Sequence, residues 1–328
     1  MQFNQRIKDT ILNNNDFSFT DTALEVFEYQ ALKNPLYKEY LSYLKVSVND
    51  VKQLTDIPFL PIEFFKHHDI LCEGVKPRIQ FQSSGTTGSI TSKHLVADPE
   101  FYQLSSQHAF EKLYGKLSDL HILALLPNYL EKGESSLVHM VDHFIKHAKQ
   151  PSGFYLYEYE KLCETIKELK AAGEKILLIG VTFALLDLSE QYSIDLSDCI
   201  LMETGGMKGR RKEMLRSEIH TIFKNAFNLK EIHSEYGMTE LLSQAYSKGQ
   251  EIFEPASSLK LLFREINDPF SVSASRKSGG INIIDLANID SCCFIETKDI
   301  GGTAGNDTFK VLGRYDNSDI RGCNLMVQ

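Results

Sequence analysis

Between residues 121 and 224, short apolar runs alternate with amphipathic stretches, and this alternation leaves few possible folds. The apolar runs cover 121–127, 175–181 and 198–203, and helix-like stretches cover 135–148 and 208–224. Buried strands that alternate with amphipathic helices are typical of βαβ units around a parallel sheet. We therefore predict an α/β fold with parallel-rich sheets flanked by helices.

The last third has a different pattern. Strand-like runs at 280–286, 292–297 and 309–314 follow one another closely with turns between them. Such spacing is typical of antiparallel strands joined by short connections. The last third is therefore predicted to be β-rich.

The first 80 residues are predicted to form a helical entry region of the same body. At 22–32, apolar residues fall on one helix face, and Asn34-Pro35 ends the pattern. No linker marks a domain boundary, so residues 81–328 are interpreted as one main body. Within it, residues 313–328 are expected to form a hinge-like tail.

Composition excludes several classes of partner. The 328 residues are 42% hydrophobic, and a net charge of −9 gives no general attraction to nucleic acid or anionic lipid. Neither a signal peptide nor a membrane span is indicated, so we expect a cytoplasmic protein without integral membrane association. The six cysteines include no CxxC pair, which disfavours a zinc ribbon or a disulfide framework.

The segment 83–89 reads Ser-Ser-Gly-Thr-Thr-Gly-Ser. Glycines let backbone amides approach an anion and hydroxyls add donors, which suits a polyphosphate, and Lys93 could add a positive charge. The pattern GxxxxGK[ST] cannot be laid over these residues, so an ordinary P-loop NTPase is disfavoured. Taken alone, such a segment is more often a plain loop.

Four further segments follow in order. They are Glu203-Thr204-Gly205-Gly206, Tyr236-Gly237-Met238-Thr239-Glu240, Thr297-Lys298-Asp299-Ile300-Gly301 and Gly313-Arg314-Tyr315-Asp316. Five segments in order are far less expected by chance than any one of them. The series resembles the signatures of the adenylate-forming superfamily, which includes acyl-CoA synthetases, luciferases and peptide-synthetase adenylation domains.

This resemblance implies the fold of the superfamily's N-terminal domain and a site for ATP and Mg²⁺. Tyr236 would pack on adenine, Thr239 would bind the α-phosphate and Glu240 would help hold Mg²⁺, roles that suit an aromatic ring, a hydroxyl and a hard oxygen ligand. Asp299 would accept hydrogen bonds from the ribose hydroxyls, and Arg314 would support the ribose or phosphate side. The nucleotide-binding residues would be Ser83, Ser84, Gly85, Thr86, Thr87, Gly88, Gly205, Gly206, Tyr236, Thr239, Asp299 and Arg314.

Without the resemblance, the same residues have plainer readings. The segment 236–240 is also typical of a glycine turn that opens a helix, with Glu240 as its N-terminal charge. Asp299 and Arg314 are equally typical of a surface ion pair at strand ends.

Within the superfamily, the chain resembles the LuxE-type acyl-protein synthetases. The likeness extends through 57–61, 63–66, 83–89, 202–210 and 320–325. The large ligases continue past the segment that matches 313–316 into a lid domain with a catalytic lysine, whereas twelve residues follow Asp316 here. We expect Lys93, Lys208 or a partner to supply the cation.

The LuxE-type resemblance implies a route for the acyl group. A carboxylic acid, a fatty acid in that family, would be activated to acyl-AMP and passed to a cysteine near the C-terminus, where Cys323 stands. Arg321 could lower the pKa of this thiol. The predicted catalytic residues are Cys323, Thr239 and Lys93, and the final acceptor would be a partner such as a reductase or a carrier.

Two alternatives stay open. The acyl group could pass directly from the adenylate to coenzyme A or a carrier protein, with Cys323 inert. The chain could also be a non-catalytic nucleotide-binding subunit. Labelling of Cys323 separates the first alternative from the main prediction, and pyrophosphate exchange separates the second.

Two further groups of residues are interpreted as structural. His139, His143 and His147 share a helix face, but the stretch lacks the glutamate of HExxH, although His139 or Ser136 stays a candidate for a substrate-site role. Cys292 and Cys293 are predicted to pack on opposite faces of a strand.

Overall fold

The computed structural model describes residues 2–13, 17–83, 90–127, 135–205 and 214–315. Its helices are α1 (Phe3–Asn13), α2 (Phe19–Lys33), α3 (Pro35–Leu44), α4 (Phe64–His67), α5 (Pro99–Tyr114), α6 (Ser136–His147), α7 (Tyr159–Ala171), α8 (Thr182–Gln191) and α9 (Arg216–Phe227). Its strands are β1 (Leu60–Pro61), β2 (Ile79–Gln82), β3 (Lys93–Val96), β4 (His121–Leu125), β5 (Gly153–Phe154), β6 (Ile176–Val181), β7 (Ile200–Thr204), β8 (His233–Tyr236), β9 (Ala245–Ser247), β10 (Phe253–Pro255), β11 (Leu259–Arg264), β12 (Ser278–Asp285), β13 (Phe294–Gly305) and β14 (Thr308–Arg314).

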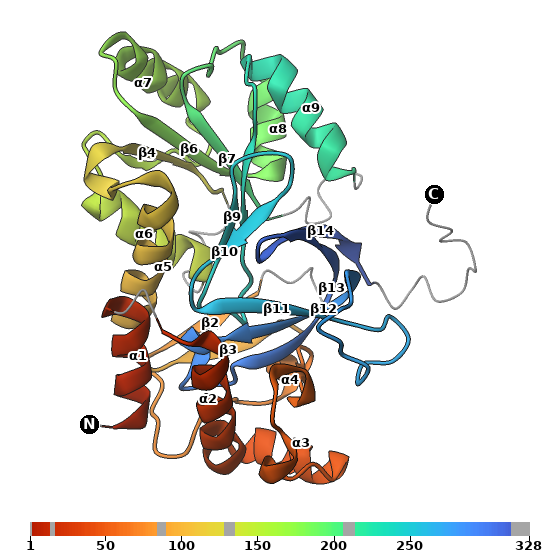
Figure 1. Ribbon diagram of the computed structural model, residues 1–328. Coiled ribbons are helices and arrows are strands. Elements are labelled where there is room, and N and C mark those ends of the chain that lie inside the picture. The colour runs from red at the N-terminus through yellow and green to blue at the C-terminus, as the bar shows by residue number, and fades with distance from the viewer. Residues whose placement is uncertain (1, 14–16, 84–89, 128–134, 206–213, 316–328) are drawn as a thin grey trace.

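One half of the main sheet is parallel. Strands β5, β4, β6, β7 and β8 lie in that order, with α5 and α6 on one side and α8 and α9 on the other (Figure 1). Every residue of β4 and β6 is buried, as strands covered on both faces require. The predicted α/β fold is confirmed, and the carboxyl ends of the parallel strands meet at one edge.

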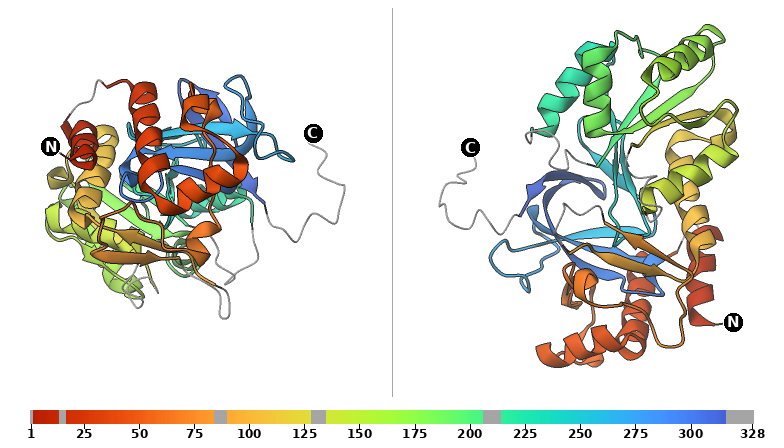
Figure 2. Two further views of the ribbon diagram at one scale, coloured as in Figure 1. Left: turned by 90° about the horizontal axis from the view of Figure 1, so that it is seen from below. Right: turned by 180° about the vertical axis from the view of Figure 1, so that it is seen from behind.

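The other half of the sheet is antiparallel and curves back. The order continues from β8 through β9, β10, β14, β13 and β12 to β11, and the strands of the last third bend in the view from behind (Figure 2). The predicted β-rich last third is confirmed. This curvature brings β13 and β14 close to the carboxyl end of β8.

Two predicted boundaries are wrong. Residues 214 and 215 are not helical and α9 begins at Arg216, because the extended Leu215 is its N-cap and donates its N–H to the Glu218 carboxylate at 3.1 Å. The strand expected over 292–297 begins only at Phe294. Cys292 and Cys293 precede it in an irregular segment, although both are fully buried, as packing residues should be.

Helices α2 to α4 lie at the base of the molecule in Figure 1, below the curved strands, and α1 lies to one side, next to α5. The buried side chain of Gln30, on α2, joins this region to the segment before β13. Its amide nitrogen lies 3.0–3.1 Å from the carbonyls of Asn288, Ile289 and Ser291, and its oxygen accepts the N–H of Cys293 at 2.9 Å. One side chain therefore satisfies several buried backbone groups. No helix in the described residues is both long and apolar enough to cross a bilayer.

Replacing Gln30 by methionine keeps the length of the side chain but leaves these backbone groups unpaired. We expect Gln30→Met to lower the free energy of unfolding by about 2–4 kcal/mol, measured by chemical denaturation. Gln5→Met, at an exposed position on α1, is the matched control and should change it by less than about 0.5 kcal/mol. Equal unfolding midpoints for the two variants would contradict the role given to Gln30.

Candidate nucleotide site

Tyr236 and Asp299 meet where the two halves of the sheet approach each other. Tyr236 ends β8, and its hydroxyl donates to Asp299 Oδ2 at 2.7 Å across the space between β8 and β13. The Tyr236 ring makes edge contacts with Phe253 of β10 and Phe309 of β14, at 5.9 and 5.5 Å between ring centroids. These two rings stack on each other at 5.4 Å and fill the bend. The fold thus brings together two residues that the sequence predicts to bind the nucleotide.

Asp299 lies beside several cations. Burial raises the pKa of its carboxyl, and the Tyr236 hydroxyl and the charges of Arg314, Arg216 and Arg264 oppose that rise. Arg314 is opposite Asp299 in the ladder between β14 and β13, and its own side chain is exposed. An exposed cation can bind the anionic part of a ligand, and a carboxylate beside it can accept hydrogen bonds from the ligand's hydroxyl groups.

The end of β7 contributes Glu203, Thr204 and Gly205 to the same edge. Glu203 is buried and lies 3.2 Å from Arg216 Nε and 3.5 Å from His220 Nε2. Although burial acts to raise its pKa, the His220 hydrogen bond and the Arg216 charge lower it overall. Gly205 has a φ of +70°, a conformation that favours glycine and explains the residue type at this turn.

Glu235 is a second buried carboxyl, one residue before Tyr236. The Thr204 hydroxyl donates to its Oε2 at 2.5 Å, and its carboxyl lies so close to Gly237 that a Cβ there would be 2.3 Å from Oε1. Burial raises the pKa of Glu235 to about 7, and the nearby Glu203 carboxylate adds to the rise. A Cβ at position 237 would therefore require the Glu235 carboxyl to move.

Thr239 and Glu240 form a turn after β8 that contacts the hairpin of β2 and β3. Ser83 and Ser92 close this hairpin: the Ser83 N–H donates to the Ser92 carbonyl at 3.0 Å, and the Ser92 N–H donates to the Ser83 hydroxyl at 2.9 Å. The Ser92 side chain in turn hydrogen-bonds the buried Glu240 carboxyl. The hairpin that carries 84–89 is thus attached to the turn.

Lys93 is the first residue of β3 in this hairpin, and its ammonium group pairs with Asp69. Its Nζ is 3.5 Å from Asp69 Oδ1, and 40% of the side chain is exposed. Its predicted catalytic role stays a prediction. Eight other residues predicted to bind the nucleotide, to supply a cation or to take part in catalysis lie outside the described residues: Ser84, Gly85, Thr86, Thr87, Gly88, Gly206, Lys208 and Cys323.

The three histidines of α6 have protein partners. His139 Nε2 lies 3.1 Å from Gln103 Nε2, His143 Nε2 lies 2.8 Å from Gln107 Oε1, and His147 Nδ1 lies 2.8 Å from the His143 carbonyl. The first two contacts attach α6 to α5, and the third lies within α6. They agree with the structural interpretation of the three side chains.

Three solved structures resemble this chain along most of its length. 2-Hydroxyisobutyryl-CoA ligase, in complex with 2-HIB-AMP and CoA, has a TM-score of 0.66 at 12% identity over 97% of this chain and 70% of its own. McyG A-PCP, complexed with phenylalanyl-adenylate, has a TM-score of 0.52 at 15% identity over 85% of this chain and 54% of its own. O-succinylbenzoate coenzyme A synthetase from Bacillus subtilis, in complex with ATP and magnesium, has a TM-score of 0.50 at 13% identity over 89% and 62%. The chain has the fold of adenylate-forming enzymes.

At identities of 12–15%, these three comparisons show a likeness in fold alone. The sequence matches no protein-family model and no curated protein. The chain spans between 54% and 70% of the length of the three structures.

Several residues of the site were not predicted from the sequence. Glu235 could have been noticed, because it directly precedes the tyrosine of a predicted motif. Arg216 stacks on the Phe253 ring at 5.3 Å and bonds Glu203, yet no sequence pattern indicated either contact.

The raised pKa of Glu235 has a consequence for stability. A glutamate in the unfolded chain titrates near pH 4.3, so the folded protein binds more protons between about pH 4.3 and 7 and loses stability as the pH rises through this window. We expect Glu235→Gln to remove this part of the decline, which makes the variant more stable than wild type by about 2–3 kcal/mol near pH 8. Chemical denaturation at a series of pH values measures it.

Glu168→Gln, on an exposed position of α7, is the control for this series and should keep the wild-type decline. A Glu235→Gln variant whose stability falls with pH as steeply as wild type would contradict the burial of a protonated carboxyl.

Proposed function

We propose that this protein is an ATP-dependent ligase that activates a carboxylic acid to an acyl-adenylate. The observation that supports this most directly is the hydrogen bond between Tyr236 and Asp299, which joins two motif segments on the fold of adenylate-forming enzymes. An oxygen of the acid would attack the α-phosphorus of ATP and release pyrophosphate, forming acyl-AMP. The protein would mainly orient the reactants and neutralise charge.

The residues around this hydrogen bond suit a nucleoside. Tyr236 would present its ring to adenine. Gly205 follows the neighbouring strand β7, and because glycine has no Cβ and adopts a positive φ there, its backbone would be accessible to the ligand. Asp299 uses Oδ2 for Tyr236 and has a second carboxylate oxygen for a ribose hydroxyl. Arg314, opposite Asp299, would face the ribose or the phosphates.

Thr239 and Glu240 would serve the phosphates. Thr239 is half-buried with a hydroxyl that can donate to a phosphate oxygen, and Glu240 is a buried carboxyl beside it. Within the described residues, no three His, Cys, Asp or Glu side chains gather closely enough to hold a metal ion. One carboxylate fits Mg²⁺, which in nucleotide sites takes its other ligands from phosphate and water and would neutralise charge on the leaving pyrophosphate.

For the second step we propose acyl transfer to Cys323, as the LuxE-type resemblance implies. The Cys323 thiolate would attack the carbonyl carbon and displace AMP, forming a thioester for a partner to collect. Tyr315 is fixed near the site, because its N–H donates to the Lys298 carbonyl at 2.7 Å. Cys323 follows Tyr315 by eight residues, and a chain of that length can span at most about 26–29 Å.

A second function is supported by the solved structures. The first was solved with CoA and another joins an A domain to a PCP domain, so direct transfer to coenzyme A or a carrier protein is the alternative outcome. A fatty acid is the substrate that the LuxE-type resemblance suggests. Lys93 or a cation of a partner would supply the positive charge that a lysine of the lid domain supplies in the large ligases.

The first step is tested by acid-dependent exchange of radioactive pyrophosphate into ATP. Wild-type protein should support exchange with at least one acid of a panel that includes long-chain fatty acids. Asp299→Asn removes the charge that would hold the ribose, so we expect the KM for ATP to rise roughly 10- to 100-fold.

Asp307→Asn is the matched control, since this aspartate lies at the tip of the same β13–β14 hairpin with an 85% exposed side chain. It should exchange like wild type. Equal KM values for the two variants, or no exchange with any acid, would contradict the proposed site.

The second step is tested with a labelled acid and Cys323→Ser. Wild-type protein should keep the label after denaturation and release it with hydroxylamine, because a thioester reacts readily with that amine. Cys323→Ser should keep exchange but lose the label, whereas Cys163→Ser, at a cysteine of α7, should retain both. Equal labelling of the Cys323 variant would contradict acylation of Cys323, whereas wild-type protein that supports exchange but keeps no label would favour direct transfer to coenzyme A or a carrier.

A further inference from the structure

Two buried side chains form hydrogen bonds to the backbone carbonyls of the turn that carries Thr239 and Glu240. His94 Nδ1 lies 2.8 Å from the Thr239 carbonyl, and Asn288 Nδ2 lies 2.8 Å from the Glu240 carbonyl. His94 belongs to β3, and Asn288 lies in the short 3₁₀ helix Leu286–Asn288 between β12 and β13. Two distant parts of the chain thus hold adjacent carbonyls of one turn.

These bonds fix the tautomer of the His94 ring and the orientation of the Asn288 amide. A carbonyl oxygen can only accept, so the proton of the His94 ring is on Nδ1 and the amide nitrogen of Asn288 faces Glu240. His94 is 1% exposed, and burial lowers its pKa to about 4, so the ring is neutral at pH 7. His94 Nε2 and Asn288 Oδ1 are therefore both hydrogen-bond acceptors.

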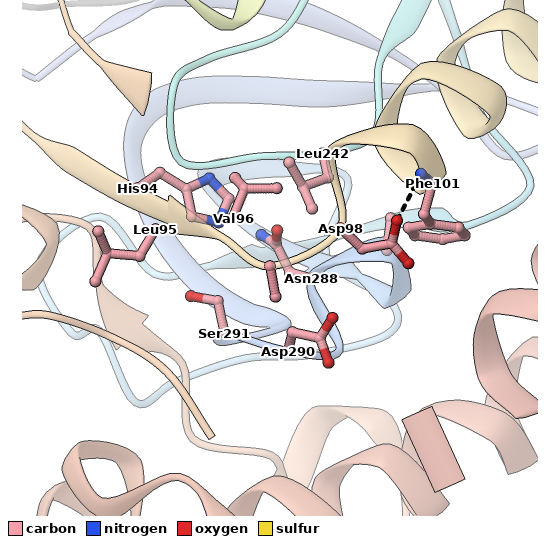
Figure 3. A pocket seen from close by; sticks show the side chains of 11 residues that line it. His94, Leu95, Val96, Asp98, Phe101, Leu242, Asn288, Asp290 and Ser291 are labelled. Atoms are coloured by element: carbon pink, nitrogen blue, oxygen red, sulfur yellow. Dashed lines mark hydrogen bonds between the residues drawn. The ribbon is translucent and has the colours of Figure 1, made fainter. Parts of the chain in front are cut away.

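Both acceptors belong to residues that line one small cavity (Figure 3). In the described part of the chain, neither atom has a hydrogen-bond partner. The cavity leaves about 10 Å³ for the centre of a water molecule, which is room for one. The cavity is also lined by Asp98 and Asp290, and Lys8 bridges their carboxylates, with its Nζ 2.9 and 2.6 Å from them.

A single water fits this arrangement chemically. Its two O–H groups could donate to His94 Nε2 and Asn288 Oδ1 together, which would satisfy two buried acceptors that otherwise cost stability. Ser92, which directly precedes β3, bonds the Glu240 carboxyl. The hairpin, the turn and the 3₁₀ helix would then be joined by one continuous hydrogen-bonded unit.

We propose that His94 and Asn288 are positioning residues for the turn that carries Thr239 and Glu240, and that one buried water joins them behind it. The unit fixes this turn against the hairpin that bears 84–89. Its effect on catalysis rests on the proposed function, whereas its effect on the turn does not. A small displacement of groups that contact the phosphates would slow the chemical step more than it weakens binding.

The test compares three variants. His94→Leu removes the donor to Thr239, and His94→Asn keeps it, because the asparagine amide nitrogen stands where Nδ1 stands. His121→Leu is the matched control: His121 is 2% exposed, and its Nδ1 lies 2.9 Å from the Pro151 carbonyl, at the amino end of β4 and so at the opposite edge of the sheet. Asn288→Ala replaces His94→Leu if the latter does not fold.

The rate of hydrogen–deuterium exchange in the segment 236–243 measures how firmly the turn is held, and it needs no substrate. His94→Leu should speed exchange there by roughly tenfold, as expected for the loss of one buried hydrogen bond, while His94→Asn and His121→Leu stay near wild type. Unchanged exchange in His94→Leu, or equal acceleration by His121→Leu, would overturn the proposal.

Pyrophosphate exchange then measures the effect of the same variants on kcat and on the KM for ATP. Per folded enzyme, His94→Leu should lower kcat roughly 10- to 100-fold with a much smaller change in the KM for ATP, and His94→Asn should recover most of the loss. If wild type supports no exchange with any acid, the proposed function is wrong, and deuterium exchange still decides the role of His94. A crystal structure should show one water bonded to both acceptors, and an empty cavity would overturn that part.

Discussion

The hydrogen bond from Tyr236 to Asp299 is the contact on which the arrangement of the site depends. It joins the end of a parallel strand to an antiparallel strand 63 positions away. The bend that permits this contact is filled by the stacked rings of Phe253 and Phe309, so apolar packing sets the position of a polar pair. Because Asp299 is partly buried, its charge depends on that hydroxyl and on the surrounding arginines.

Several other buried polar side chains of the described residues bond partners that are distant in the sequence. Gln30 attaches the entry helices to the segment before β13, and Glu203 is ionised between Arg216 and His220. An unpaired polar group inside a protein costs stability, so such bonds specify where each segment must lie. The site is thus built by long-range polar contacts on an apolar α/β framework.

The sequence predicts the framework well because its signals are local. The apolar runs at β4, β6 and β7 and the spaced strands of the last third are visible in the order of residues alone, and so are the motif residues Tyr236 and Asp299. The start of α9 was placed too early, since the amphipathic pattern does not show that Leu215 is extended and acts as the cap. The contacts of His94 and Gln30 could not be predicted, because their partners lie 145 and about 260 positions away.

The central claim is that an oxygen of the acid attacks the α-phosphorus of ATP, and isotope transfer tests it most directly. The acid that supports pyrophosphate exchange would be labelled with ¹⁸O in its carboxyl group and incubated with protein, ATP and an acyl acceptor, and the AMP would be analysed by mass spectrometry. The account predicts one ¹⁸O atom in the phosphate of AMP, because the bridging oxygen of the adenylate leaves with AMP when the acyl group is transferred. Turnover that yields unlabelled AMP, or ¹⁸O in inorganic phosphate, would contradict it.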